Sequence, residues 1–283
     1  MTRTLTVRLR GVGLLGPGLT DWASGASLLR EPANWQPSAT ILGAPSRLPA
    51  AERRRAGAIV KLSIAVAEQA CADAGIDSHS LATVFSASTG DAHNCHALCE
   101  ALASADPQLS PTRFTNSVHN AAAGYWHIAA GSRAPSTSLC GFDASFGAGL
   151  LEAVSQCVAG QRAVLLVVAD VPYPEPLHSQ RPLPDAFGVA LLISPDIAGS
   201  EVPGQPQGTN LSLRLVARST GATKPQPELS GCDDPRLEAL RQTLPAGRAL
   251  PLLQALAAGR AAQLVIDYLD TLGLAVELSP ATA

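Results

Sequence analysis

The sequence predicts an α/β fold in which helices cover a mixed, mainly parallel sheet. Three stretches carry that prediction. Residues 136–142 form a short run that ends at a Gly-rich turn, residues 147–158 are typical of a helix that stops at Gly160, and residues 163–169 are a continuous apolar run of strand length. Strand, turn, helix and strand in this order make a βαβ unit, in which the two strands run parallel.

The first third of the chain adds a strand and two helices. Residues 4–15 alternate as in a strand, and Asp21 is suited to cap a short helix that follows it. Residues 31–49 carry four prolines and predict an irregular excursion. Residues 52–74 repeat apolar side chains at helical spacing, which predicts one long helix that ends at Gly75.

The next strand, at residues 81–88, is followed by a helix that is rich in soft metal ligands. These ligands are His93, Cys95, His96 and Cys99. A helix brings several of them together, but their spacing matches no common zinc pattern. We therefore interpret the segment as an ordinary amphipathic helix and predict no metal site.

A polar cluster precedes the small-residue stretch AAAGYWHIAAG. Asn116, Ser117, His119 and Asn120 belong to it, and the small residues that follow predict a helix packed closely on a neighbouring backbone. His119 is either a core or capping hydrogen-bonder or part of a pocket or interface. Because no orienting acid accompanies Ser117 and His119, the pair does not predict a hydrolytic triad.

The remainder of the chain alternates loops, strands and short helices. Residues 171–185 contain five prolines and predict a loop, and residues 194–208 are a candidate boundary. The expected elements are strands at 187–193 and 211–218, helices at 236–244 and 250–258, and a closing hairpin at 263–270 and 274–278.

Composition limits the classes of function. The chain has 283 residues, of which 46% are hydrophobic and 15% charged, with a net charge of −3. This balance implies neither nucleic acid nor an anionic membrane as partner, and no apolar stretch reaches membrane-spanning length. Six cysteines without a disulfide-framework spacing, and a beginning without a signal-peptide core, lead us to expect a cytoplasmic protein.

Asp143 occupies the turn between the strand and helix of the βαβ unit. A helix N-terminus offers unpaired N–H groups and partial positive charge, so a Cys there would be an activated nucleophile. An Asp at the same place is well explained as a cap or first-turn charge. A carboxylate nucleophile or base is the alternative, although no partner for it is visible in the sequence.

The surroundings of this turn resemble the nucleophile region of β-ketoacyl synthases, members of the thiolase-like superfamily. The matching positions are Ala134, Pro135, residues 138–142, Asp143, Glu152, Ala153 and Gly160. The stretches SVHNAAAGYWHIAAG and ASFGAGLLEA further resemble a narrower group, the short chain-length-factor-like homologues of aryl polyene pathways. The resemblance covers residues 1–220 with decreasing clarity.

This resemblance implies a thiolase-like, layered α/β/α fold with a truncated second half. The expected organisation is a single domain over residues 1–283, with a ketosynthase-like N-terminal half at 1–200 and a shortened C-terminal part at 201–283. It also puts Asp143 at the position of the nucleophilic Cys, because Cys140 comes three residues too early.

Active synthases also use two histidines from the second half, in HGTGT-like and NSFGFGG-like contexts. Neither motif occurs here, and the last histidine is His178. The resemblance therefore implies a pseudo-ketosynthase rather than an enzyme, and no cofactor.

By resemblance to chain-length factors, we expect the chain to form a heterodimer with an active ketosynthase of a type II polyketide or fatty-acid-like pathway. An acyl carrier protein would then contact this chain only as part of the complex. The strand 138–142 would lie at the pairing surface, and Phe142 would face the acyl tunnel. The interface or tunnel candidates are Asn116, His119, Asn120, Ser138, Leu139, Cys140, Phe142 and Phe146. Three alternatives stay open: an acyltransferase that uses Asp143, a free-standing acyl-binding protein, and a purely structural scaffold.

Overall fold

The computed structural model describes residues 3–196, 208–218 and 227–280. Within them the strands are β1 (Leu5–Leu15), β2 (Ala82–Ser86), β3 (Ser136–Leu139), β4 (Val164–Asp170), β5 (Phe187–Pro195), β6 (Thr209–Ala217), β7 (Ala262–Leu269) and β8 (Leu272–Ser279). The α-helices are α1 (Trp22–Arg30), α2 (Ala50–Arg55), α3 (Ala58–Ala74), α4 (Ala92–Ala103), α5 (Pro111–Ser117), α6 (Ala121–Ala130), α7 (Ser145–Gly160), α8 (Leu177–Gln180), α9 (Pro235–Thr243) and α10 (Leu250–Ala257). Short 3-10 turns are η1 (Pro32–Asn34), η2 (Ser78–Ser80), η3 (Phe142–Ala144) and η4 (Ala246–Ala249). The expected boundary at 194–208 lies outside the described residues except at its ends.

The described strands form one mixed sheet in the order β3-β2-β4-β5-β1-β6-β8-β7. The mixed sheet was predicted, but the expectation that it would be mainly parallel is wrong. Only β2 pairs in parallel, with β3 on one side and β4 on the other, and every other pairing among the described strands is antiparallel. Helical crossovers connect β2, β3 and β4, whereas β4 turns back into β5 through a loop and β7 into β8 through a hairpin.

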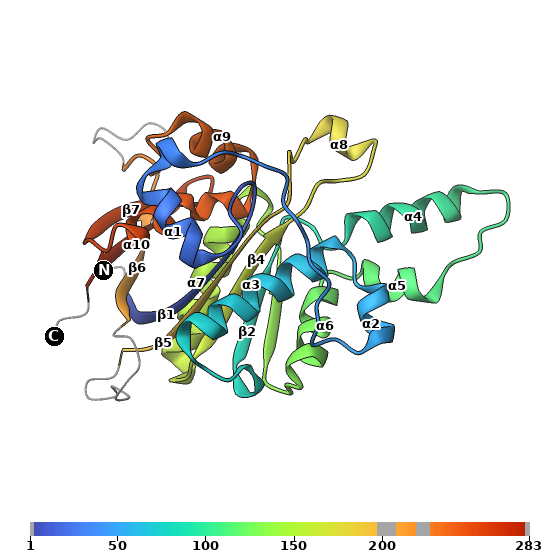
Figure 1. The fold of residues 1–283 in the computed structure, drawn as a ribbon, viewed down its shortest axis with the longest axis horizontal. Coiled ribbons are helices and arrows are strands. Elements are labelled where there is room, and N and C mark those ends of the chain that lie inside the picture. Colours follow the sequence, from blue (N-terminus) through green and yellow to red (C-terminus); the bar gives the residue numbers. More distant parts are fainter. Residues whose placement is uncertain (1–2, 197–207, 219–226, 281–283) are drawn as a thin grey trace.

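Helices cover both faces of the sheet, as the layered α/β/α prediction requires (Figure 1). Side chains of β4 alternate between the two covers because successive residues of a strand point to opposite faces. Leu165 and Val167 join the core beneath α3 and α6, together with Leu62 and Trp126. The residues between them, such as Leu166, join the core on the other face beneath α7 and α10.

Two predicted elements are shorter than expected. The helix expected over 52–74 is interrupted because Ala56 and Gly57 have extended backbone, so α2 ends before them and α3 begins after them. A Cβ at Gly57 would come within 2.4 Å of the Asp91 carboxylate. The strand expected over 138–142 ends at Leu139 because the next residues form the tight turn η3. Gly75 ends α3 in the left-handed conformation, as predicted, with a φ of 63°.

Most other predicted elements are confirmed. Asp21 caps α1 by accepting a hydrogen bond from the Ser24 N–H at 2.8 Å. The closing hairpin is β7 and β8, and the helices expected after residue 235 are α9 and α10. The loop after β4 contains the unpredicted short helix α8. The division into a ketosynthase-like half and a shortened C-terminal part stays a prediction.

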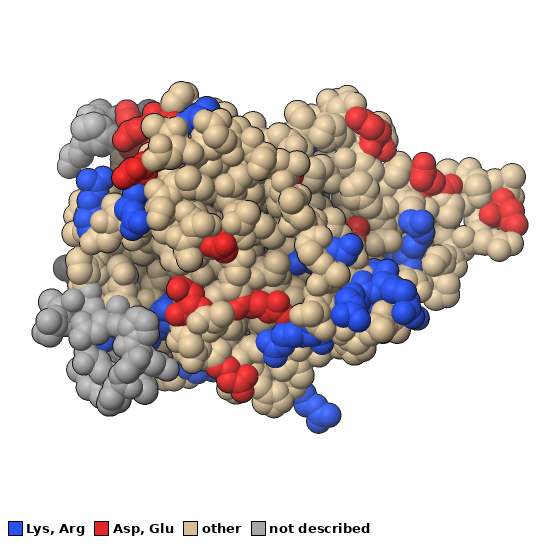
Figure 2. All heavy atoms as spheres, viewed as in Figure 1, with Lys and Arg blue, Asp and Glu red and all other residues tan. Residues whose placement is uncertain are grey.

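Helices α4 and α5 form an arm that projects beyond the sheet on the side of β2 and β3 (Figure 1). The arm, defined here as residues 92–118, carries large apolar side chains in solvent. These are Leu102, Leu109, Phe114 and Val118. Figure 2 shows basic side chains gathered near α2, which contributes Arg53, Arg54 and Arg55. Among the helices of the described residues, none has the length and apolarity to cross a membrane.

Candidate functional site at the start of helix α7

The turn between β3 and α7 is held in an unusual backbone conformation. Phe142 has a φ of 53°, a left-handed value that costs a non-Gly residue about 1 kcal/mol. Ser145 stabilises the turn, because its hydroxyl donates to the Phe142 carbonyl at 2.7 Å and accepts from the Gly141 N–H at 3.1 Å. The turn therefore presents Asp143 just before α7, with its side chain 47% exposed.

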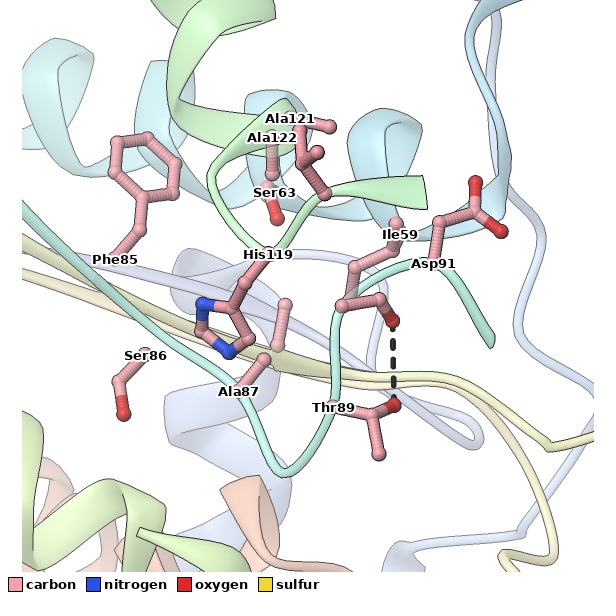
Figure 3. Close-up of a pocket in the computed structure, with 13 residues that line it drawn as sticks. Ile59, Ser63, Phe85, Ser86, Ala87, Thr89, Asp91, His119, Ala121 and Ala122 are labelled. Atoms are coloured by element: carbon pink, nitrogen blue, oxygen red, sulfur yellow. Dashed lines mark hydrogen bonds between the residues drawn. The ribbon is translucent and has the colours of Figure 1, made fainter. Parts of the chain in front are cut away.

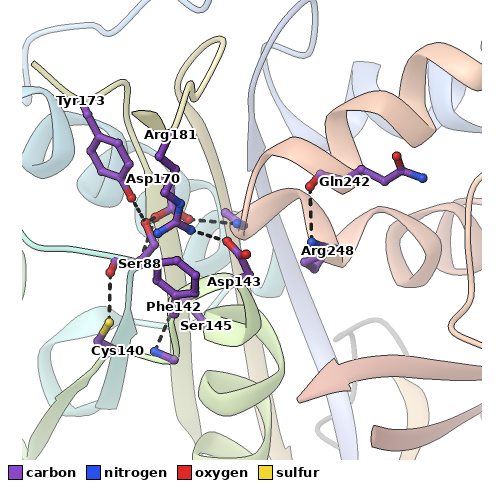
Figure 4. A network of polar contacts seen from close by, with 12 residues as sticks. Ser88, Cys140, Phe142, Asp143, Ser145, Asp170, Tyr173, Arg181, Gln242 and Arg248 are labelled. Carbon is purple, nitrogen blue, oxygen red and sulfur yellow. Dashed lines mark hydrogen bonds and ion pairs between the residues drawn. The ribbon is translucent and has the colours of Figure 1, made fainter. Parts of the chain in front are cut away.

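Arg181 reaches this turn from the loop that follows β4. Its guanidinium pairs with the Asp143 carboxylate and lies 3.7 Å from the centre of the Phe142 ring (Figure 4). The same guanidinium is 5.7 Å from the centre of the Tyr173 ring. Asp143 therefore has a cationic partner, which the sequence did not reveal because Arg181 sits in a proline-rich loop without periodicity.

Asp170, at the end of β4, forms the buried part of the same network. Its carboxylate accepts from the Ser88 N–H at 2.8 Å, from the Ser88 hydroxyl at 2.5 Å and from the Ala246 N–H at 2.9 Å. The Tyr173 hydroxyl lies 2.6 Å from the Ser88 hydroxyl. Burial raises the pKa of Asp170, and its hydrogen bonds and Arg181 oppose that rise. These contacts join the ends of β2 and β4 to η4. They form the buried part of the polar network next to the turn.

The predicted candidates in the polar cluster have different surroundings. Asn116 is buried, donates to the Arg55 carbonyl at 3.1 Å and accepts from the Tyr125 hydroxyl at 3.0 Å, which ties α5 to α2 and α6. His119 lines a cavity of about 20 Å³ beside β2 (Figure 3). Its Nε2 atom is buried and has no hydrogen-bond partner among the described residues. Asn120 is exposed at the start of α6.

A larger groove lies between the arm and the loop that follows β4. The α4 groove, as we name it, has a volume of about 310 Å³. It is lined by Thr89, Gly90, Asp91, Ala92, Cys95, His96, Cys99, Ser117, Pro174 and Leu177. Cys95 and Cys99 are exposed on α4, so small side chains form much of one wall.

The histidines of α4 have partners other than a metal. His93 Nε2 donates to the Pro172 carbonyl at 3.1 Å, and His96 Nε2 lies 3.3 Å from a Glu100 carboxylate oxygen. Within residues 3–196, 208–218 and 227–280, no group of three or more potential ligands is placed to hold a metal ion.

The candidates near the turn divide between surface and core. Ser138 and Leu139 are half-buried in β3, the last strand of the sheet. Cys140 is exposed, and its thiol donates to the Ser88 carbonyl at 3.0 Å. Phe142 is 59% exposed, whereas Phe146, in the first turn of α7, is completely buried. Phe146 therefore contributes to the core of this chain, and the pairing and tunnel roles of the others stay predictions.

A family profile described as the N-terminal domain of β-ketoacyl synthases matches residues 22–243 of the chain. A search of curated protein sequences found no match. The profile spans β2, the turn at Asp143, α7 and the loop with Arg181, so it covers the site described above except for Ala246 of η4.

Solved structures of ketosynthases are similar to the chain. A ketosynthase, ApeO, in complex with its chain length factor, ApeC, from Xenorhabdus doucetiae matches with a TM-score of 0.67 at 22% identity, covering 96% of this chain and 99% of that one. The ishigamide ketosynthase/chain length factor matches with a TM-score of 0.71 at 16% identity, covering 98% and 100%. AntDE:AntF, a type II acyl carrier protein in complex with its ketosynthase, matches with a TM-score of 0.72 at 12% identity, covering 98% and 99%. At these identities the likeness establishes the shared fold, which is the thiolase-like fold predicted from the sequence.

Proposed function

Because the chain belongs to the β-ketoacyl synthase family, we propose that it is a non-catalytic, chain-length-factor-like partner of an active ketosynthase in a type II polyketide or aryl polyene pathway. The main observation in support of this proposal is the identity of the residue in the turn before α7. Asp143 stands where the resemblance places the nucleophilic Cys, and its carboxylate is engaged by Arg181. The ion pair engages this carboxylate and so lowers its reactivity toward a thioester.

The distribution of histidines supports the same proposal. The last histidine of the chain is His178, so none follows β5 to take the two roles that the resemblance assigns to the second half. A nucleophile and two histidines act as a unit, and removing one member of such a unit already costs several orders of magnitude in rate. Condensation would therefore depend on a partner.

The surface around β3 suits such a partner. β3 is an edge strand, and an edge strand offers unpaired N–H and C=O groups to another chain. Beside it the arm exposes Phe114 at 62% and Leu102 at 60%. Contiguous apolar surface of this kind marks protein–protein contacts, and a permanent pair would bury well over ~2,000 Å².

We place the acyl tunnel of this pair along the α4 groove. The groove lies between the arm and the loop that follows β4, so a partner seated on the arm would cover it, and Cys95 and Cys99 leave room that bulkier side chains would fill. Phe142, exposed at the neighbouring turn, would contribute an aromatic wall. The subunit would thus shape the space for the growing chain while the partner performs the chemistry.

Coexpression with the ketosynthase encoded beside this chain tests the proposal. We expect the two proteins to elute together in size-exclusion chromatography at micromolar concentration, in a one-to-one ratio. Separate elution, together with full-length product from the ketosynthase alone, would show that the partner role is wrong. A stable monomer that binds acyl chains by itself would instead support a free-standing acyl-binding protein.

A further inference from the structure

Arg181 connects the loop that follows β4 to the turn before α7. On one side it contacts the Asp143 carboxylate and the Phe142 ring, which belong to a turn fixed by Ser145. On the other side it ends α8, because its N–H donates to the Leu177 carbonyl at 2.9 Å. The Arg181 side chain is 20% exposed and the Asp143 side chain 47% exposed, so the ion pair is partly open to water.

The loop 171–186 is anchored at both ends, and its later part is held by the buried side chain of Leu183 and by Asp185, which accepts from the Thr40 N–H at 3.0 Å. Its beginning is held by the Pro172 carbonyl, which accepts from His93, and by the Tyr173 hydroxyl beside Ser88. Around α8 itself, the Ser179 hydroxyl and N–H donate to Glu175, a contact within the loop that does not tie it to the body. Arg181 is therefore the residue through which α8 is fastened to the turn before α7.

The same loop forms a wall of the α4 groove. Pro174 and Leu177 line the groove opposite Cys95 and Cys99, and Leu177 is 43% exposed. A shift of α8 would move Leu177 directly, because Leu177 is its first residue. The width of the groove therefore depends on how firmly α8 is held.

We propose that the Asp143–Arg181 ion pair is a latch that fixes α8 against the start of α7 and so sets the wall of the α4 groove. Arg181 then acts as a positioning residue for acyl-chain length, an assignment that rests on the proposed function. In this account Asp143 occupies the position of a nucleophile but holds Arg181, and through it the α8 wall of the groove, in place.

Charge and stacking both contribute to the latch. A guanidinium on an aromatic face and a partly exposed ion pair together correspond to roughly a fivefold change in an opening equilibrium. Arg181 also stabilises the buried Asp170 carboxylate electrostatically. Removing Arg181 should therefore loosen the loop more than removing the charge of Asp143.

Amide hydrogen exchange of the purified full-length chain tests the latch without any partner. We expect Arg181→Met to speed exchange over residues 174–181 by roughly fivefold and Asp143→Asn to speed it by less, with unchanged protection of β4. Because both variants break one contact, the double variant should exchange no faster than Arg181→Met alone. Arg162→Met, at an exposed arginine beyond α7, is the matched control and should leave the loop unchanged.

Unchanged exchange in both single variants, or effects that add in the double variant, would overturn the latch. The wall is tested separately in the coexpressed pair, where both single variants should broaden the distribution of product lengths and Arg162→Met should not. Faster exchange in the loop 171–186 with an unchanged distribution of product lengths would show that the position of α8 does not determine the width of the α4 groove. A loosened loop in a chain that never pairs would refute the proposed function and the wall while leaving the latch intact.

Discussion

The two edges of the sheet end in different ways. At the β7 edge, the segment before α9 lies along the strand, and the Ser230 N–H donates to the Val265 carbonyl at 2.9 Å while the Ser230 hydroxyl accepts from the Val265 N–H at 3.0 Å. At the β3 edge, no strand of the described residues pairs with the outer side of β3. One edge is closed by the chain itself, whereas the other is left open.

The segment that lies along the β7 edge is held in place by helix α9. Glu238 of α9 accepts from the Cys232 N–H at 2.9 Å and from the side chain of Arg241, so the segment that carries Ser230 is fastened to α9. The β3 edge has instead the arm with its exposed apolar side chains. Since edges left open in native proteins invite association, the difference supports the proposed pairing on the β3 side.

The largest effect is expected from a charge on the arm. Phe114→Asp would bury an unpaired carboxylate in the pairing surface and should weaken the heterodimer by about 3 kcal/mol, roughly a hundredfold in Kd. Analytical ultracentrifugation of the coexpressed proteins measures this. Phe114 is exposed in the isolated chain, so the substitution should leave folding intact.

Leu269→Asp is the matched control for this experiment, because Leu269 is an exposed leucine at the end of β7. It should leave pairing unchanged. Leu139→Asp should also break the pair, but Leu139 packs partly against the core, so a thermal melt must accompany it. If the Leu269 variant dissociates the pair and the Phe114 variant does not, the assignment of the two edges is reversed.

A smaller effect is expected from acid at the closed edge. Hydrogen bonding by Arg241 lowers the pKa of Glu238 to about 2. A depressed carboxyl pKa stabilises the fold above the pKa of the unfolded chain, and this contribution is lost as the pH falls from about 5 toward 2. Glu238→Gln should therefore cost about 2 kcal/mol of unfolding free energy at pH 7, a figure that allows for partial exposure.

Denaturant unfolding at several pH values measures this difference between the wild type and Glu238→Gln. The difference should shrink as the pH falls through that range. Glu228→Gln, an exposed residue of the covering segment, is the control and should show no such trend. A difference for Glu238→Gln that stays constant between neutral and acidic pH would mean that the ion pair does not hold the cover.

Local sequence patterns predicted the elements better than their pairing. The apolar run of β4 and the small residues of α7 allow both elements to be recognised from the sequence. A strand that is buried on both faces is a continuous apolar run whichever strands it pairs with. Strand direction is decided by connections, and nothing in residues 5–15 indicates that β1 lies between two antiparallel neighbours. The close approach of Gly57 to Asp91 likewise involves another segment of the chain.

The site was predictable only in part for the same reason. Asp143 was located by its place between a strand and a helix, which is a local feature. Its partner Arg181, and the buried contact of Ser88 with Asp170, join segments that are far apart in sequence. Such pairs carry no periodic signal, so their chemistry becomes visible only when the ends of β2 and β4 are brought together.

The most direct test of the central claim is a condensation assay with the purified chain. Incubated with acyl- and malonyl-carrier protein, the chain alone should form no new carbon–carbon bond, and Asp143→Cys should not form one either, because the histidines are still missing. Adding the partner ketosynthase should produce full-length product. Condensation by the chain alone that is abolished by Asp143→Asn would contradict the account and identify Asp143 as a catalytic residue.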